Sequence, residues 1–180
     1  MSNTVFFIEQ DLISNDVCKK LVSLFKESPN VLPTTVDKYQ GAWSELSFNP
    51  KDPILVEYLK ELKRVMDSYI LKYPYANEYA PFTIIDPIKI QHYTPGIGFD
   101  SWHTERFSAK EPYVSRHLVF MTYLNTVTDK GGTEFLHQNL TVSPQEGLTL
   151  IWPADWTFTH RGAVSPTQEK YIITGWYNFL

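Results

Sequence analysis

The chain has 180 residues, 43% of them hydrophobic and 15% aromatic, which is the composition of one folded domain with a substantial core. The formal net charge is −4, with acidic and basic residues interspersed, so the sequence has no basic stripe suited to nucleic acid and no polybasic membrane patch. We expect neither a nucleic acid nor a membrane among its partners, and the oligomeric state stays open.

Cysteine content and the N-terminal residues bear on the compartment. Cys18 is the only cysteine, which excludes an internal disulfide and a thiolate zinc cluster and favours a reducing environment. Residues 1–16 have no basic start and no long apolar run, so we expect no signal peptide. The apolar runs elsewhere are too short for a membrane span. The expectation is a cytoplasmic protein.

The N-terminal part begins with a short predicted strand over residues 5–8. Ser14 then provides the N-cap of a helix that ends near Pro29. Residues 31–50 contain turn residues and scattered aromatics without a clear period, so no element is predicted there. In the helix that Ser14 caps, the apolar residues recur at helical spacing; they are Val17, Leu21, Leu24 and Phe25.

A second helix is predicted from Pro53, a favourable first-turn residue, to about Tyr73, where Pro74 ends it. Its apolar stripe predicts one face packed on the core. The stripe consists of Ile54, Leu55, Tyr58, Leu59, Leu62, Val65, Met66, Tyr69 and Ile70.

From residue 82 onward the hydrophobic period changes to 2, which is typical of strands. Helices followed by many short strands predict a single α+β domain over residues 1–180, with helical support over about 1–80 and an antiparallel sandwich or barrel over about 82–180. The predicted strands are 82–93 (with a break at Asp86-Pro87), 98–105, 116–125, 132–142, 147–152, 156–161 and 169–178.

The segment Trp102-His103-Thr104-Glu105 places an imidazole and a carboxylate two residues apart, on one side of an extended strand. With His160 on a late strand, two histidines and one carboxylate make up the facial triad of non-haem iron(II) sites. The same ligands suit manganese or zinc. Taken one at a time, each of the three is more simply an unrelated polar residue on a strand, and we assign the remaining histidines, His92, His117 and His137, to structural or surface positions.

Competing catalytic motifs are absent from the sequence. There is no His-Glu-x-x-His zincin signature, no Gly-x-Ser-x-Gly elbow, and no phosphate-binding loop. The segment Gly96-Ile97-Gly98 precedes a predicted strand and not a helix, so it does not form a dinucleotide-binding loop.

The order of several motifs from about residue 85 to the C-terminus resembles the iron(II)- and 2-oxoglutarate-dependent dioxygenases, specifically the prolyl 4-hydroxylase-like branch. The family's segments are matched by Tyr93-Thr94-Pro95-Gly96, His103-Thr104-Glu105, Thr122-Tyr123-Leu124-Asn125, Gly131-Gly132-Thr133-Glu134-Phe135, Pro144-Gln145-Glu146-Gly147, His160 and Lys170-Tyr171-Ile172-Ile173-Thr174-Gly175-Trp176. The resemblance implies a double-stranded β-helix, a jelly-roll or cupin-like barrel, supported by the N-terminal helices.

For the metal, the resemblance implies that His103, Glu105 and His160 bind iron. Glu105 departs from the Asp that is usual in this branch; it adds one methylene and keeps the charge. Related halogenases have a small residue there, so Glu105 favours hydroxylation over halogenation.

For the co-substrate, the resemblance implies that Lys170 pairs with the C5 carboxylate of 2-oxoglutarate. Tyr123 matches a position that often hydrogen-bonds the same carboxylate, Tyr93 matches one that lines the pocket, and Trp176 would lie near the metal face. Without the resemblance, Lys170 is as readily an exposed lysine at a strand end and the tyrosines are core aromatics. Arg116 and Arg161 are the next candidates for the cation.

The implied activity is hydroxylation of an unactivated C–H bond with Fe(II), 2-oxoglutarate and O2, and with ascorbate as reductant. The first expected substrate is a prolyl residue of a peptide or protein; the alternative is a free amino acid or other small molecule. A second class, a non-catalytic metal- or ligand-binding barrel of the same fold, also fits. Residues 107–115 and 31–50 are expected to supply lid loops.

Overall fold

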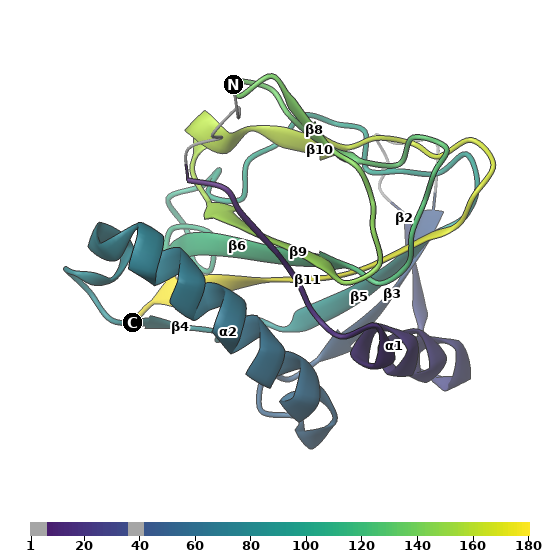
Figure 1. Cartoon of the computed structure of the whole chain (residues 1–180), viewed down its shortest axis with the longest axis horizontal. Coiled ribbons are helices and arrows are strands. Elements are labelled where there is room, and N and C mark those ends of the chain that lie inside the picture. Colours follow the sequence, from purple (N-terminus) through teal and green to yellow (C-terminus); the bar gives the residue numbers. More distant parts are fainter. Residues whose placement is uncertain (1–6, 36–41) are drawn as a thin grey trace.

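The computed structural model describes residues 7–35 and 42–180, and it consists of two antiparallel sheets supported by two helices (Figure 1). The large sheet has the strand order β1-β9-β6-β11-β5-β3-β2, with β4 also paired to β11, and the small sheet has the order β10-β7-β8. The strands are β1 Glu9–Leu12, β2 Leu32–Thr35, β3 Ala42–Phe48, β4 Phe82–Thr83, β5 Ile88–Tyr93, β6 Arg116–Tyr123, β7 Thr133–Phe135, β8 Leu140–Val142, β9 Leu148–Pro153, β10 His160–Gly162 and β11 Lys170–Phe179.

The helices lie against one face of the large sheet, and the small sheet faces the other (Figure 1). The two sheets do not close into one continuous barrel within the described residues. This arrangement confirms the expected α+β architecture of the double-stranded β-helix type. The helices are α1 Asn15–Glu27 and α2 Val56–Lys72, and the short 3-10 turns are η1 Pro53–Leu55, η2 Pro74–Asn77 and η3 Trp156–Phe158.

Local sequence signals place both helices as predicted. The Ser14 side chain accepts a hydrogen bond from the Asp16 amide and caps α1. Asp52 caps the turn that leads into α2 in the same way, by accepting from the Ile54 amide. Pro53 stands at the first position of that turn, and α2 ends at Lys72, just before Pro74.

Helix α2 buries one face against the large sheet. Leu62 and Val65 are fully buried, and burial of aliphatic side chains of this size contributes roughly 1.5–3 kcal/mol each. Ile54 was expected in the same stripe, but it is 49% exposed, whereas its neighbour Leu55 in the same turn η1 is fully buried. The buried residues of α2 are Tyr58, Leu62, Val65, Met66 and Tyr69.

The large sheet is buried on both faces, which explains the nearly continuous apolar sequence of β6. Leu118 and Phe120 belong to the core between the sheet and the helices, whereas Val119, Met121 and Tyr123 belong to the core between the two sheets. Successive side chains of a strand point to opposite faces, so both cores draw on the same strand. The second core is the one that borders the candidate site.

Two strand predictions near the site are wrong. Residues 98–105 form no strand; they contain a single bridge between His103 and His160, because only a short stretch of this backbone reaches a partner strand. Residues 132–142 are not one strand but the hairpin β7–β8, whose turn includes Asn139 in the left-handed region (φ 46°).

The remaining boundaries also shift. Residues 156–158 form η3, so the predicted strand at 156–161 begins only at His160. Of the predicted strand at 5–8, residues 5 and 6 lie outside the described residues, and the observed strand β1 begins at Glu9. Residues 31–50, for which no element was predicted, contain β2 and β3, with 36–41 outside the description.

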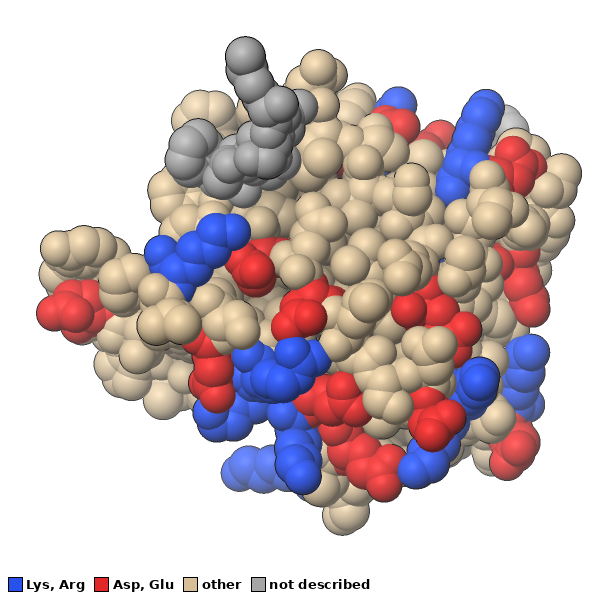
Figure 2. Space-filling view, in the orientation of Figure 1, with Lys and Arg blue, Asp and Glu red and all other residues tan. Residues whose placement is uncertain are grey.

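Charged side chains of both signs are interspersed over the helical part of the face shown in Figure 2. Several are paired across elements, as in Lys20–Glu57 (2.7 Å) and Lys72–Glu9 (2.9 Å). Such exposed pairs contribute little to stability. No helix in the described part of the chain is long and apolar enough to cross a membrane.

Candidate functional site

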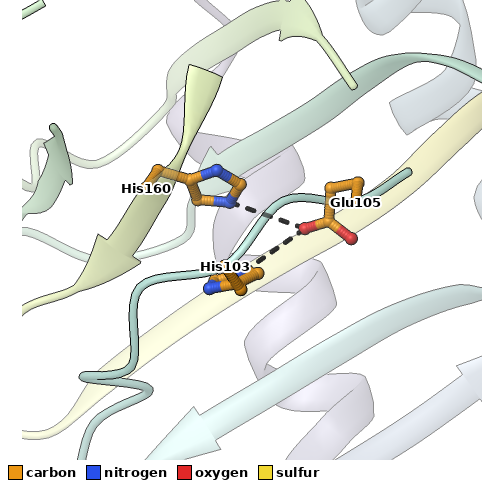
Figure 3. A group of neighbouring side chains, drawn as sticks. All are labelled: His103, Glu105 and His160. Atoms are coloured by element: carbon orange, nitrogen blue, oxygen red, sulfur yellow. Dashed lines mark ion pairs between the residues drawn. The ribbon is translucent and has the colours of Figure 1, made fainter. Parts of the chain in front are cut away.

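His103, Glu105 and His160 converge on one point between the two sheets (Figure 3). Oε1 of Glu105 lies 3.4 Å from Nε2 of His103 and 3.5 Å from Nε2 of His160, and the three ligand atoms all lie within 4.8 Å of one another. The backbone bridge between the two histidines, with N···O distances of 3.0 and 2.9 Å, brings their rings together. Two imidazole nitrogens and one carboxylate oxygen form a ligand set that suits a divalent metal.

Backbone carbonyls orient both imidazole rings. Nδ1 of His103 lies 2.9 Å from the Ser101 carbonyl oxygen, and Nδ1 of His160 lies 2.9 Å from that of Phe158. A carbonyl oxygen only accepts hydrogen bonds, so each Nδ1 donates to its carbonyl and each Nε2 points toward Glu105. Both rings therefore present Nε2, the nitrogen that would bind a metal.

The Glu105 carboxylate is held from two sides. Burial opposes its ionisation, but its contacts with His103 and His160 outweigh burial and hold the pKa of this carboxyl well below its usual range. Its second oxygen, Oε2, accepts hydrogen bonds from Nε1 of Trp176 (3.0 Å) and from Nη1 of Arg116 (3.2 Å). Glu105 is therefore ionised and available to a cation.

A cavity of about 270 Å³ lies beside this triad. It is lined by residues from both sheets, so it exists only because β5, β6 and β11 of the large sheet face β7 and β10 of the small one. The structure brings all seven predicted site residues to this cavity: His103, Glu105, His160, Tyr93, Tyr123, Lys170 and Trp176.

Lys170 is a buried cation in the wall of the cavity. The residue is only 4% exposed, and Nζ donates to the carbonyl oxygens of Gly131 (2.9 Å) and Ala163 (3.2 Å). It forms no ion pair within residues 7–35 and 42–180. Burial lowers the pKa of this ammonium to about 8. Because an unpaired buried charge is costly, the arrangement favours an anionic ligand in the cavity.

Two buried tyrosines add polar groups near the lysine. The hydroxyl of Tyr123 lies 2.6 Å from Oγ1 of Thr133, and the hydroxyl of Tyr93 donates to Oε1 of Gln91 at 2.8 Å. Burial raises the pKa of both phenols, so they stay protonated at neutral pH and can donate hydrogen bonds. The Tyr93 ring also lies 5.1 Å from Nζ of Lys170.

The other cations considered from the sequence lie elsewhere. Arg161 pairs with Glu134 at 2.7 Å and covers the ring of Trp102. Arg116 contacts the Glu105 carboxylate and not the cavity wall. This contact was not predicted, because the sequence shows Arg116 only as the first residue of an apolar strand.

The three remaining histidines lie apart from the triad. His92 pairs with Glu169 at 3.0 Å, His117 contacts the Ala76 carbonyl oxygen at 2.8 Å, and His137 packs edge-on against Trp156. These contacts agree with the structural and surface positions assigned from the sequence.

Comparison with solved structures supports the fold at low sequence identity. A viral collagen prolyl hydroxylase from Paramecium Bursaria Chlorella virus-1, in complex with 2OG, superposes with a TM-score of 0.71 at 14% identity, covering 100% of both chains. A Pseudomonas putida prolyl-4-hydroxylase gives 0.70 at 15%, covering 96% of this chain and 92% of that one. A Trichoplax adhaerens prolyl hydroxylase in complex with a hypoxia inducible factor peptide fragment gives 0.68 at 18%, covering 98% and 84%.

Sequence comparison identifies the family. No curated protein sequence matches the chain. The model of the 2OG-Fe(II) oxygenase superfamily, in contrast, matches residues 88–178, just over half of the chain and the part that contains the triad, both tyrosines and Lys170. The family implies Fe(II), 2-oxoglutarate and O2. The two imidazoles and the carboxylate of the triad are ligands that suit such a divalent metal. The chain belongs to the 2OG-Fe(II) oxygenase superfamily.

Proposed function

We propose that this protein is a 2-oxoglutarate-dependent dioxygenase that hydroxylates an unactivated C–H bond, with a prolyl residue of a peptide or protein as its substrate. One observation carries the proposal. Three side chains suited to a metal line the same cavity as a buried cation that has no counter-anion among the residues that the structure describes. A site that only bound a metal would have no use for Lys170, because an uncompensated ammonium destabilises the fold.

Three residues would hold the iron: His103 and His160 through Nε2, and Glu105 through Oε1. This set leaves three coordination positions open. When bound, the iron and its co-substrates supply the oxidising chemistry, in which one O2 and one 2-oxoglutarate give succinate, carbon dioxide and one hydroxylated product. Ascorbate would serve as the reductant that keeps the iron ferrous.

The remaining residues bind and orient the co-substrate. Lys170 would exchange its carbonyl contacts for an ion pair with the distal carboxylate of 2-oxoglutarate, and the Tyr123 hydroxyl would donate to the same group. Tyr93 closes the wall beside the lysine. The apolar side chains of Phe99 and Trp152 line the same cavity and exclude water from it.

A prolyl substrate is supported by the walls of the cavity. Trp176 and Phe107 line it, and Phe107 is 63% exposed, which places an aromatic ring at its opening. The apolar pyrrolidine ring packs well on such surfaces. The solved structures that share this fold include prolyl hydroxylases, and the one from Trichoplax adhaerens contains a bound peptide.

A free amino acid is the second candidate substrate, and a cation in the cavity wall favours it. Lys89 lines the cavity, and its Nζ also lies 3.0 Å from Oε1 of Glu45, which is not among the lining residues. An ammonium in the wall matches the carboxylate of a free amino acid. A prolyl residue inside a peptide does not carry this carboxylate.

Succinate formation without a substrate tests the activity. With Fe(II), ascorbate and 2-oxoglutarate, the wild type should release succinate, and His160→Ala should release none. His137→Ala is the matched control, because this histidine lies outside the cavity, and it should behave like the wild type. The proposal fails if the wild type makes no succinate; a thermal shift with Mn(II) but no turnover would favour a non-catalytic metal-binding barrel.

Product mass tests the substrate. Proline-containing peptides and free L-proline are incubated separately, and the product should gain the mass of one oxygen atom. Each peptide has a partner in which Ala replaces Pro, and this partner should gain none. Oxygen transfer to free L-proline but to no peptide would select the second candidate.

A further inference from the structure

The two oxygens of the Glu105 carboxylate have different partners (Figure 3). Oε1 faces Nε2 of His103 and of His160, whereas Oε2 faces away from both. Oε2 accepts from Nε1 of Trp176 at 3.0 Å and from Nη1 of Arg116 at 3.2 Å. Each carboxylate oxygen has about two lone-pair sites, so the two donors saturate Oε2. Only Oε1 is left for a metal.

We infer that Arg116 and Trp176 are positioning residues, which hold Glu105 so that it binds the metal through Oε1 alone. The inference rests on the metal centre of the proposed function and adds two residues to it. Neither residue reaches the ligand atoms of the histidines. Their effect on the metal passes through the carboxylate.

Arg116 is itself fixed on several sides. Nη1 also donates to the backbone carbonyl oxygen of Glu105 at 3.2 Å, and the guanidinium carbon lies 3.6 Å from the centre of the Trp176 ring. On the far side, Nε lies 3.4 Å from Oδ2 of Asp86, which also accepts from Nδ2 of Asn178 at 3.4 Å. The guanidinium is thus held between two carboxylates and a tryptophan face.

Burial makes this network effective. Arg116 is 7% exposed, Asp86 8%, Trp176 9% and Asn178 0%. Charge-assisted hydrogen bonds are stronger and less screened where water is excluded. Removal of one member would leave a buried polar group without its partner, which costs free energy.

The two donors restrict an orientational freedom that glutamate has and aspartate lacks. Glu105 has one more rotatable bond than the Asp usual at this position, so its carboxylate has more orientations to choose from. A carboxylate free to turn could bind the metal through both oxygens. It would then occupy one of the three positions that 2-oxoglutarate and O2 require. Donors on Oε2 prevent this rotation.

The inference is tested by measuring how Trp176→Phe changes metal affinity, first in the wild-type protein and then in a Glu105→Asp variant. Mn(II) alone is the probe, and its dissociation constant is measured by calorimetry and its coordination by electron paramagnetic resonance. Trp176→Phe removes one donor and keeps the ring. It should weaken Mn(II) binding by about 10-fold, as loss of a partner of a metal ligand typically does, and alter the Mn(II) spectrum.

The second background is Glu105→Asp. Its shorter side chain withdraws the carboxylate from both donors, so Trp176→Phe added to it should change Mn(II) affinity by less than about 2-fold. Trp156→Phe, at an exposed tryptophan, is the control and should change neither background. Arg116→Gln should repeat the pattern, but it leaves Asp86 without its charge partner, so its fold is checked first by thermal melting.

The outcomes separate this inference from the proposed function. Equal weakening by Trp176→Phe in both backgrounds, or none in either, overturns the positioning role, although succinate is still formed. If the wild type does not bind Mn(II), or binds it as tightly as His160→Ala does, the metal centre itself is wrong and the inference falls with it.

Discussion

Nζ of Lys170 donates to the backbone carbonyl of Gly131 across 2.9 Å, and this dipole takes the place of a counter-ion. The lysine is 4% exposed and pairs with no carboxylate in the part of the chain that the structure describes. Burial lowers the pKa of its ammonium from the ordinary value of 10.5 to about 8. The charge that the proposed co-substrate needs is therefore lost at moderately alkaline pH.

The first prediction concerns 2-oxoglutarate affinity against pH. Above a pH of about 8 the free protein loses the Lys170 charge, so binding of the dianion must take up a proton and the affinity should fall, by up to 10-fold per pH unit. Lys170→Arg keeps its charge and should show a flat profile. Calorimetry with Mn(II) under anaerobic conditions, from pH 7 to 9.5, measures both. An equal fall in Lys170→Arg would mean that another group titrates.

The same group affects folding stability with a defined sign. In the unfolded chain the pKa of Lys170 is near 10.5, so between pH 8 and 10.5 the unfolded state binds more protons than the folded state. The free energy of unfolding of the wild type should therefore rise with pH in this window, relative to Lys170→Met. Urea denaturation at several pH values measures the difference. A constant difference would contradict the lowered pKa.

Tyr123 should contribute to co-substrate binding more than to stability. Its hydroxyl lies 2.6 Å from Oγ1 of Thr133 and 3.2 Å from the Val142 carbonyl oxygen, at the wall of the cavity. Its one hydrogen would turn from the Val142 carbonyl to the co-substrate. Tyr123→Phe should weaken 2-oxoglutarate binding by about 10-fold, the loss of one hydrogen bond to a charged group. Tyr93→Phe is the comparison, since this tyrosine is expected to line the pocket and not to bond the carboxylate. Unchanged affinity in Tyr123→Phe would make this tyrosine a core residue only.

A buried hydroxyl chain should couple α2 to the large sheet. Oγ1 of Thr122 lies 3.1 Å from the Tyr58 hydroxyl and 2.7 Å from Oγ1 of Thr149, and all three residues are almost fully buried. Thr122→Val leaves both partners without this bond and should lower the free energy of unfolding by about 1–3 kcal/mol. Tyr75→Phe, at a tyrosine 74% exposed, should cost almost nothing. Urea denaturation compares the two, and equal costs would rule out the coupling.

Two glycines with positive φ form a matched pair. Gly147 (φ +83°) has no room for a side chain, because a Cβ there would collide with the Ile13 carbonyl oxygen. Gly96 (φ +81°) has nothing within 4 Å of that position. Gly96→Ala should cost about 1–2 kcal/mol for the left-handed backbone, and Gly147→Ala about 1–3 kcal/mol more for the collision. Thermal melting compares the stabilities of the two variants. Similar melting temperatures would show that the backbone near Ile13 shifts to make room for the new Cβ.

The helices were predictable because their signals are local. The cap at Ser14, the proline at position 53 and the stop at Pro74 act within one turn of the chain, so they need no tertiary context. The strand pattern was equally clear where both faces of a strand are buried, as in β6. The same pattern predicted a strand over residues 98–105 that does not form, because alternating residue types do not supply the partner strand that a β-strand needs.

The family followed from the order of motifs along the chain, and the seven residues that these motifs single out line one cavity in the structure. The roles of Arg116 and of the Glu105 oxygens did not follow. Arg116 reaches Glu105 because β6 lies beside β11, where Trp176 supplies the second donor. Which oxygen remains for the metal depends on contacts between residues far apart in the chain, and only the packed strands bring those residues together.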